Sequence, residues 1–205
     1  MISEITNPSG NPTNARGDKD GNALVTVAHA KYADAVRAGR VFTGGTDASG
    51  VAPGTALGTT AAFALENPLN SGVHLVVLTM SMGYKSGTLG AGTVLYTTDD
   101  NPSNAVPIAS STAITPTSSL LGSGKTASAK LHDAATLLNT PTILRPFVAL
   151  QASLASTAVT PWQVTDHLDG EIVLGEGSIL AMEGIAASGS SPLVFFGCTW
   201  EEVSI

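Results

Sequence analysis

The sequence predicts an all-β protein, an antiparallel β-sandwich that follows an extended N-terminal arm and one short helix. From residue 41 onward, short runs rich in Val, Ile, Leu, Thr and aromatic residues recur, and each is bounded by Gly, Pro, Asn, Asp or Ser. Little helix-forming sequence separates these runs, which argues for antiparallel sheets and against parallel βαβ units. We therefore divide the chain into an arm with a helix, residues 1–40, and a sandwich domain, residues 41–205.

The first forty residues have no strand pattern. Residues 1–22 are rich in Asn, Pro, Gly and Asp, and we expect an extended arm without a core of its own. The segment Val27–Gly39 contains good helix formers and places Tyr32 and Val36 one turn apart, which predicts a helix that ends at Gly39. A weaker helix signal covers Thr126–Leu138.

The sandwich domain contains six strong strand signals and four shorter ones. The strong runs are Val73–Tyr84, Ala91–Thr98, Thr142–Ser153, Gly170–Leu174, Ser178–Ala187 and Pro192–Val203. The shorter runs lie near Phe42 and at Ala61–Glu66, Val106–Ala113 and Val159–Val164. Each has the length and the flanking turn residues that are typical of strands in a sandwich.

Two of these runs show which side chains should face the core. Because side chains alternate along a strand, one face of the last run carries Val194, Phe196, Cys198 and Trp200. The run from residue 73 to 84 has one apolar face and a second face that is apolar in its first half. We expect a loop or another subunit to cover that second face.

The composition limits the possible partners. Charged residues make up 12% of the chain and the net charge is −7, which argues against nucleic-acid binding, because a basic surface is needed to displace counterions. Two long stretches, Asn101–Gly124 and Pro146–Thr165, have no charged residue. We expect neighbouring subunits to cover much of so uncharged a surface. No apolar run is long enough to span a membrane, and the single cysteine, Cys198, excludes a disulfide framework.

The stretch "GSGKT" contains the second half of a nucleotide-binding loop. The first glycine of that motif is replaced by Ser119, and a polar segment with Pro116 stands where a buried strand should precede it. We therefore expect a surface loop with a solvated Lys125. The four histidines have no metal-ligand spacing, and no serine lies in a nucleophile elbow. The sequence thus predicts no catalytic residue, cofactor or metal, although a hairpin tip with Asp99 and Asp100 has the composition to hold a cation.

Several long phrases resemble tailed-bacteriophage virion proteins. These are "HAKYADAVRAGRVFTGGTDASGVAPGTALGTTAAFALENP", "GVHLVVLTMSMGYKSGTLGAGTVLYTT", "PTILRPFVALQASLASTAVTPWQV" and "DGEIVLGEGSILAMEGIAASGSSPLVFFGCTWEEV". The end of the chain, "IVLGEGSIL" with "WEEV", resembles the closing hairpin of viral jelly rolls. The resemblance implies a jelly-roll cement (decoration) protein, a homotrimer on the outer surface of the capsid that contacts the major capsid protein. The alternative is a tail or baseplate jelly roll that binds a host-surface glycan.

The cement hypothesis names contact residues around the predicted helix. The basic ones would face acidic groups of the shell and the aromatic ones apolar groups; the set is Arg16, Lys31, Tyr32, Arg37, Arg40 and Phe42. An equally acceptable interpretation is that the helix closes one end of the sandwich. Trp162 lies in a charge-free stretch, and we expect it to anchor a subunit interface; under the alternative it would stack on a sugar.

Overall fold

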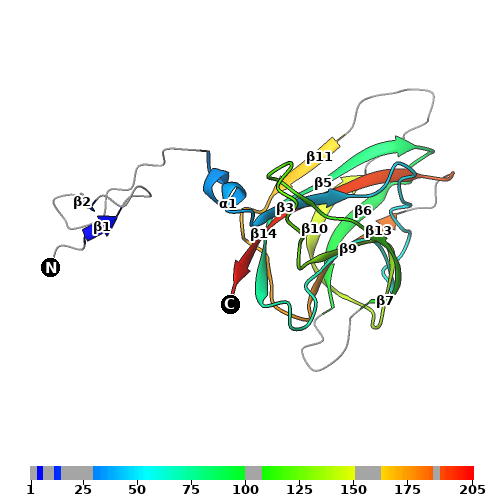
Figure 1. Cartoon of the computed structure of the whole chain (residues 1–205). Helices are drawn as coiled ribbons and strands as arrows, with labels where there is room; N and C mark the ends of the chain where they lie inside the picture. The colour runs from blue at the N-terminus through cyan, green and yellow to red at the C-terminus, as the bar shows by residue number, and fades with distance from the viewer. Residues whose placement is uncertain (1–3, 7–11, 15–29, 100–107, 151–162, 187–189) are drawn as a thin grey trace, which may run out of the picture. The chain divides into compact units, whose positions relative to one another are not determined.

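Two antiparallel sheets packed face to face form the main body of the protein (Figure 1). The computed structural model describes residues 4–6, 12–14, 30–99, 108–150, 163–186 and 190–205. The chain divides into two units, residues 1–34 and 35–205. In the first unit, β1 (Glu4–Thr6) and β2 (Pro12–Asn14) pair as a short antiparallel ladder, which the arm was not expected to contain.

The helix is shorter than the sequence predicts. α1 spans Ala33–Arg37, whereas the prediction began at Val27, and residues 27–29 lie outside the described part. The predicted C-terminal cap is confirmed. Gly39 has a φ of +73° and donates its N–H to Val36 O at 2.9 Å, while the N–H of Arg40 reaches Ala35 O at 3.0 Å. This pair of hydrogen bonds satisfies carbonyls that the last turn would otherwise leave open.

The first sheet has the strand order β11-β5-β14-β3-β8, with β12 also paired to β5, and the second has the order β10-β6-β13-β4-β9-β7. The first sheet consists of β3 (Val41–Gly45), β5 (Val73–Ser86), β8 (Thr117–Ser118), β11 (Gln163–His167), β12 (Val173–Leu174) and β14 (Leu193–Ser204). The second consists of β4 (Thr60–Glu66), β6 (Gly92–Thr98), β7 (Ile108–Ile114), β9 (Lys130–Leu137), β10 (Thr142–Leu150) and β13 (Ile179–Ala186).

Eight of these strands are wound as a jelly roll. In chain order they are β3, β4, β5, β6, β10, β11, β13 and β14, and they pair first with last, second with seventh, third with sixth and fourth with fifth. A long hairpin that is rolled up around a core produces this pairing. The segment from β7 to β9 is inserted between the fourth and fifth of these strands. It adds β8 to the first sheet beside β3, and it adds β9 and β7 to the second sheet beside β4, at the edges away from β11 and β10. The predicted all-β sandwich is confirmed.

The core lies between the two sheets. Val194, Phe196, Cys198 and Trp200 are all at most 2% exposed, so the face predicted for the last strand is confirmed. Phe63 of the second sheet stacks on Phe196, with ring centroids 6.0 Å apart. Burial raises the pKa of the Cys198 thiol, which makes it a small apolar core residue and not a reactive one.

A second apolar cluster lies on the other face of β13. Its members are Ala61, Ala64, Ile108, Ala135, Leu137, Ile179 and Ala181. Ile179 and Ala181 alternate with Leu180 and Met182, which belong to the main core, so this strand is covered on both faces. Both β7 and β9 are bulged where they pair, and the bulge in β9 includes Ala134, whose φ is +47°.

A β-bulge explains the half-apolar second face of residues 73–84. Cys198 and Thr199 of β14 pair with Met80 and Thr79, but Trp200 pairs with Val77, so Leu78 is an extra residue in β5. The bulge reverses the alternation, and Leu75 and Val77 therefore join Met80 and Met82 in the main core. The expectation that a loop or another subunit covers Leu75 and Val77 is wrong, because their own core does.

The helix signal at Thr126–Leu138 is also wrong. Lys130–Leu137 forms β9, which lies between β4 and β7 and buries Leu131, Ala135 and Leu137. Tertiary pairing on both sides outweighs the helix propensity of its Ala, Lys and Leu residues. The predicted strand at Val159–Val164 is found as β11, Gln163–His167, and residues 159–162 lie outside the described part. Among the described residues, no helix is long and apolar enough to cross a membrane.

Candidate interaction surface

One predicted contact residue is unavailable for contact with another protein. Phe42 is 2% exposed, belongs to the main core and stacks on Trp200 with centroids 6.1 Å apart. Its neighbour in the sequence, Val41, is buried as well, so the start of β3 enters the core directly. Phe42 is therefore corrected from a capsid contact to a core residue. Arg16 and Trp162 lie outside the described residues.

The other predicted contact residues are on or next to α1. Arg37 and Arg40 are exposed, and Arg40 forms an ion pair with Glu201 of β14 at 2.8 Å. This ion pair already compensates part of the Arg40 charge, which was predicted to face acidic groups of the capsid. In the first unit, Lys31 is exposed and its Nζ lies 5.2 Å from the ring centre of the half-buried Tyr32. Capsid contact by these four residues stays a prediction.

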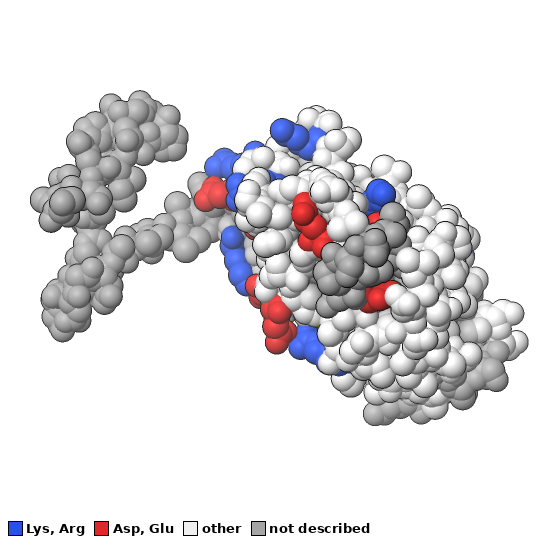
Figure 2. Space-filling model, turned by 90° about the horizontal axis from the view of Figure 1, so that it is seen from below, with Lys and Arg blue, Asp and Glu red and all other residues white. Residues whose placement is uncertain are grey.

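Large parts of the described surface have no charged side chain. Figure 2 shows a broad area without Lys, Arg, Asp or Glu, while the side chains of both signs gather mainly toward one side of the view. Exposed apolar side chains add to this character. They include Leu121 at 81%, Val173 at 50%, Leu138 at 47%, Leu144 at 46% and Ile143 at 45%. Several of them concentrate at two places, one at each edge of the sandwich.

The first place is a hollow between β10, β12 and β13. It has a volume of about 280 Å³ and is lined by Thr98, Leu144, Glu171, Ile172, Val173, Leu174, Ser178, Ile179 and Leu180. We call it the edge hollow, because β10 is an edge strand of the second sheet. In the first sheet, β12 pairs with β5 on the same side as the edge strand β11. Most of the hollow's lining residues are aliphatic, polar atoms make up nearly half of its exposed surface, and Glu171 supplies a carboxylate with a side chain that is 63% exposed.

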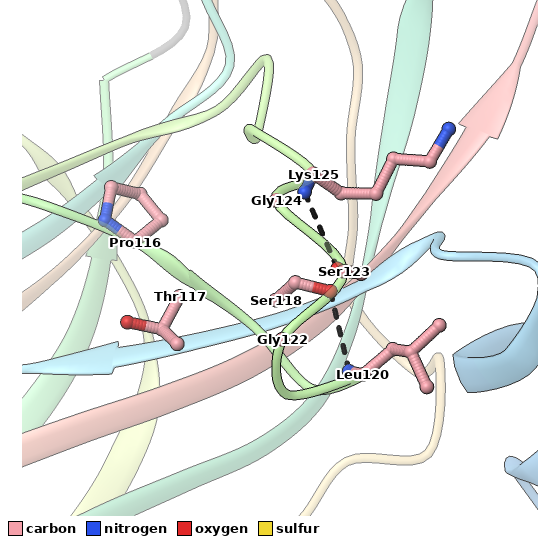
Figure 3. Close-up of a pocket in the computed structure, with 8 residues that line it drawn as sticks. All are labelled: Pro116, Thr117, Ser118, Leu120, Gly122, Ser123, Gly124 and Lys125. Carbon is pink, nitrogen blue, oxygen red and sulfur yellow. Dashed lines mark hydrogen bonds between the residues drawn. The ribbon is translucent and has the colours of Figure 1, made fainter.

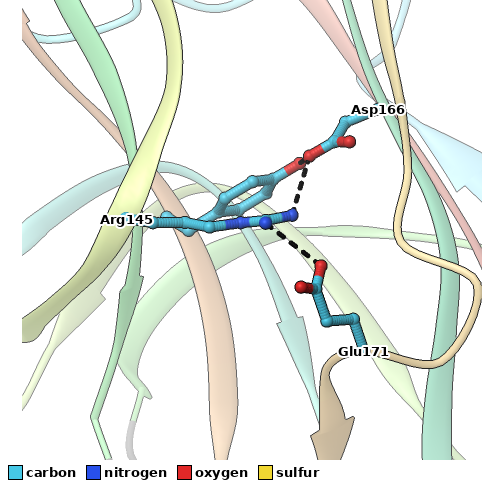
Figure 4. A network of polar contacts seen from close by, with 4 residues as sticks. Arg145, Asp166 and Glu171 are labelled. Atoms are coloured by element: carbon cyan, nitrogen blue, oxygen red, sulfur yellow. Dashed lines mark hydrogen bonds and ion pairs between the residues drawn. The ribbon is translucent and has the colours of Figure 1, made fainter.

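A polar network closes the sandwich beside the edge hollow. Arg145 of β10 contacts Asp166 of β11 and Glu171 of the following turn, each at 3.0 Å, so its guanidinium links the edges of the two sheets (Figure 4). The hydroxyl of the buried Tyr96 donates to Asp166 at 3.1 Å, and the Arg145 guanidinium lies 5.5 Å from the Tyr96 ring centre. Burial and the Asp166 carboxylate raise the pKa of Tyr96, so the phenol stays a donor. The network therefore links the two sheets beside the hollow.

The second place is the loop between β8 and β9, at the opposite edge. A hollow of about 190 Å³ lies here (Figure 3), lined by Pro116, Thr117, Ser118, Leu120, Gly122, Ser123, Gly124 and Lys125. Leu120 and Leu121, which we call the leucine knob, are 37% and 81% exposed. The loop is held by its own turns, because Ser118 Oγ accepts the N–H of Leu120 at 3.2 Å and Ser123 Oγ accepts that of Lys125 at 3.3 Å.

The loop does not have the context of a nucleotide-binding loop. A two-residue strand precedes it and the strand β9 follows it, whereas phosphate binding needs a helix N-terminus after the glycines. Lys125 is exposed and extends away from Ser118 and Ser123 (Figure 3). Its aliphatic part lies over Gly39, where an added Cβ would come within 3.1 Å of Cγ.

Three strands of the second sheet hold a relay that the sequence analysis did not identify. Ser111 Oγ of β7 lies 2.7 Å from His132 Nδ1 of β9, and His132 Nε2 lies 2.8 Å from Glu66 Oε2 of β4. Such distances match a nucleophile, a base and an orienting acid. They also match a purely structural hydrogen bond, because Glu66 is 1% exposed and a buried carboxyl group requires a partner. The spacing of the three residues in the sequence gives no signal for either.

We expect a fluorophosphonate probe, which reacts with activated serines, to leave Ser111 unmodified. We expect a structural role for the relay, because His132 gives the buried Glu66 carboxylate a partner and Ser111 lines neither hollow described above. Mass spectrometry of the intact protein measures the modification. Labelling that disappears in the Ser111→Ala and His132→Gln variants would instead identify a serine hydrolase.

Other buried carboxylates also have structural partners. Glu183 accepts hydrogen bonds from Thr97 Oγ1 and Gly58 N, both at 3.1 Å, and burial raises its pKa. Burial also raises the pKa of Asp133, whose Oδ1 has no partner. Asp99 of the suspected cation site is 8% exposed and lies beside the amide of Asn139, while Asp100 is outside the described residues. In the described part of the chain, no group of three acidic, His or Cys side chains could hold a metal.

No family model, curated protein or solved structure matches this chain. The resemblance to tailed-phage virion proteins therefore stays a prediction from the sequence. The structural features from which a function can be inferred are the jelly-roll fold and the two apolar places at its edges.

Proposed function

We propose that this protein is a structural virion protein, a homotrimeric cement protein that binds the outer surface of a phage capsid and bridges major capsid subunits. One observation carries the proposal: a jelly-roll sandwich with few charges exposes apolar side chains at both of its edges. Clustered apolar surface on a soluble domain is typical of contact with other proteins. The net charge of −7 disfavours a role inside the head on packaged DNA.

The physical requirement of such a role fits this surface. A shell that contains packed DNA is under outward pressure, and additional lateral contacts hold its subunits together. Burial of apolar surface contributes roughly 25 cal/mol per Å² before the costs of association. A trimer that makes three equivalent contacts with the shell gains further through avidity, so each contact can be modest.

Image reconstruction of the virions that carry this protein is expected to show its density repeated over the whole head. Virions without the protein serve as the control, and their heads should lose this density and rupture at lower temperature. Density that is confined to the tail or baseplate would contradict the cement role. It would favour the alternative, a jelly roll that binds a host-surface glycan.

A further inference from the structure

The leucine knob and the edge hollow lie on opposite edges of one subunit, at the same level. A continuous row of paired residues connects them across the first sheet. Ser119, next to the knob, donates its N–H to Val41 O; Val41 pairs with Glu201, Glu201 with Val76, and Val76 with Val173 at the hollow. The row crosses from β8 through β3, β14 and β5 to β12, so the two places are about 19 Å apart at about 4.8 Å per strand.

We propose that the leucine knob of one subunit inserts into the edge hollow of the next, and that this heterologous contact closes the homotrimer. The partner is a second copy of this chain. The inference rests on the proposed function, which requires a trimer, and adds which surfaces build it. Contacts between two different surfaces generate a ring when the rotation closes, whereas a contact of one surface with itself gives a two-fold dimer.

The dimensions of the two places agree. The edge hollow has a volume of about 280 Å³. An engineered apolar cavity of about 150 Å³ already accepts benzene, so the hollow has room for the four side-chain carbons of a leucine. Its aliphatic walls include Leu144 and Val173, which stay half exposed in the isolated subunit. Leu121, the most exposed large apolar side chain among the described residues, would become buried there.

The loop that carries the knob and the rim of the hollow contain opposite charges. Lys125 is the only charged residue between Asn101 and Ala129, and it is exposed in the loop of the knob. At the rim of the hollow, the Glu171 side chain is 63% exposed and forms an ion pair with Arg145, so Lys125 would share this carboxylate. Opposite charges at the rim of an interface guide its orientation and its rate of formation more than its affinity. A contact of knob against knob would instead bring two Lys125 side chains together.

Engineered cysteines test the contact in the full-length protein. Cys198 is the only native cysteine and is buried, so disulfides formed under mild oxidation report on the introduced residues alone. The variant with both Leu121→Cys and Val173→Cys is expected to give covalent dimers and a closed covalent trimer on a non-reducing gel. Each single-cysteine variant should stay uncross-linked, because the contact joins two different positions. A second double variant, Leu120→Cys with Leu144→Cys, tests the same contact with a neighbouring pair of residues.

Sedimentation of a charge variant provides an independent measurement. Leu121→Asp should change the wild-type trimer into a folded monomer with an unchanged β circular dichroism spectrum, because Leu121 is 81% exposed within the subunit. Ile205→Asp, at a residue that is 73% exposed outside both places, is the matched control and should stay trimeric. A wild-type trimer in which neither double variant cross-links, or in which a single variant does, would overturn this contact and leave the trimer standing. A wild-type monomer at micromolar concentration would overturn both.

Discussion

Replacing Phe42 by alanine is expected to destabilise the isolated protein by about 3–5 kcal/mol, the usual range for removing a large buried aromatic side chain. Phe42 is 2% exposed and stacks on Trp200, which is itself fully buried. The indole N–H of Trp200 donates to Glu202 at 3.4 Å, and Glu202 also accepts the N–H of Ala129 at 3.0 Å. The cavity would therefore adjoin the contacts that hold the segment before β9.

Denaturant unfolding at a fixed protein concentration measures the effect. The matched control is Val203→Ala, a shorter truncation at a residue of β14 that is 40% exposed, and we expect it to change the free energy of unfolding by less than about 1 kcal/mol. The result separates two roles for Phe42. A capsid contact would leave the isolated protein as stable as the wild type, and equal stability of Phe42→Ala would contradict its place in the core.

The sequence predicted the strands whose side chains alternate without interruption. β14 is an example, because its buried and more exposed residues alternate and that alternation is visible in the sequence. The segment of β9 carried a weak helix signal and no strand signal, since the propensities of Ala, Leu and Lys are local while its pairing with β4 and β7 comes from distant segments. β8 has only two residues and is too short to give a periodic signal.

Less of the candidate interaction surface could be predicted from the sequence. Leu144 and Val173 are exposed because β10 and β12 lie at an edge, and the strand order is a property of the whole fold. Leu121 lies in a charge-free stretch that did indicate a covered surface, but the stretch does not show which side chain protrudes. Phe42 was assigned to the surface by its proximity to basic residues, and the direction of a side chain at the start of a strand cannot be read from its neighbours.

Deleting Leu78 is expected to lower the free energy of unfolding by about 1–3 kcal/mol more than the Leu78→Ala substitution does, because two backbone hydrogen bonds are lost as well. The deletion removes the extra residue of the bulge, so Val77 is joined directly to Thr79 and a regular ladder can keep Val77 opposite Trp200. Val77 and Leu75 therefore stay on the core face. The deletion removes the Leu78 side chain, which is 2% exposed, and the carbonyl of the bulge.

The bulge has a second structural task, which makes the deletion more damaging. The carbonyl of Leu78 accepts the N–H groups of Leu168 at 2.9 Å and Asp169 at 3.0 Å, so it holds the turn between β11 and β12. That turn carries Glu171 and leads to Val173, two residues of the edge hollow. Leu78→Ala is the matched control, since it keeps the bulge and its carbonyl, and it should stay folded with a stability lower by about 2–4 kcal/mol.

Circular dichroism and thermal unfolding of both variants measure the difference. A deletion variant that is as stable as Leu78→Ala would contradict the role of the Leu78 carbonyl in holding the turn between β11 and β12. The expected result is a larger loss of stability with a cooperative transition retained, because Leu75 and Val77 keep their places in the core when the ladder becomes regular.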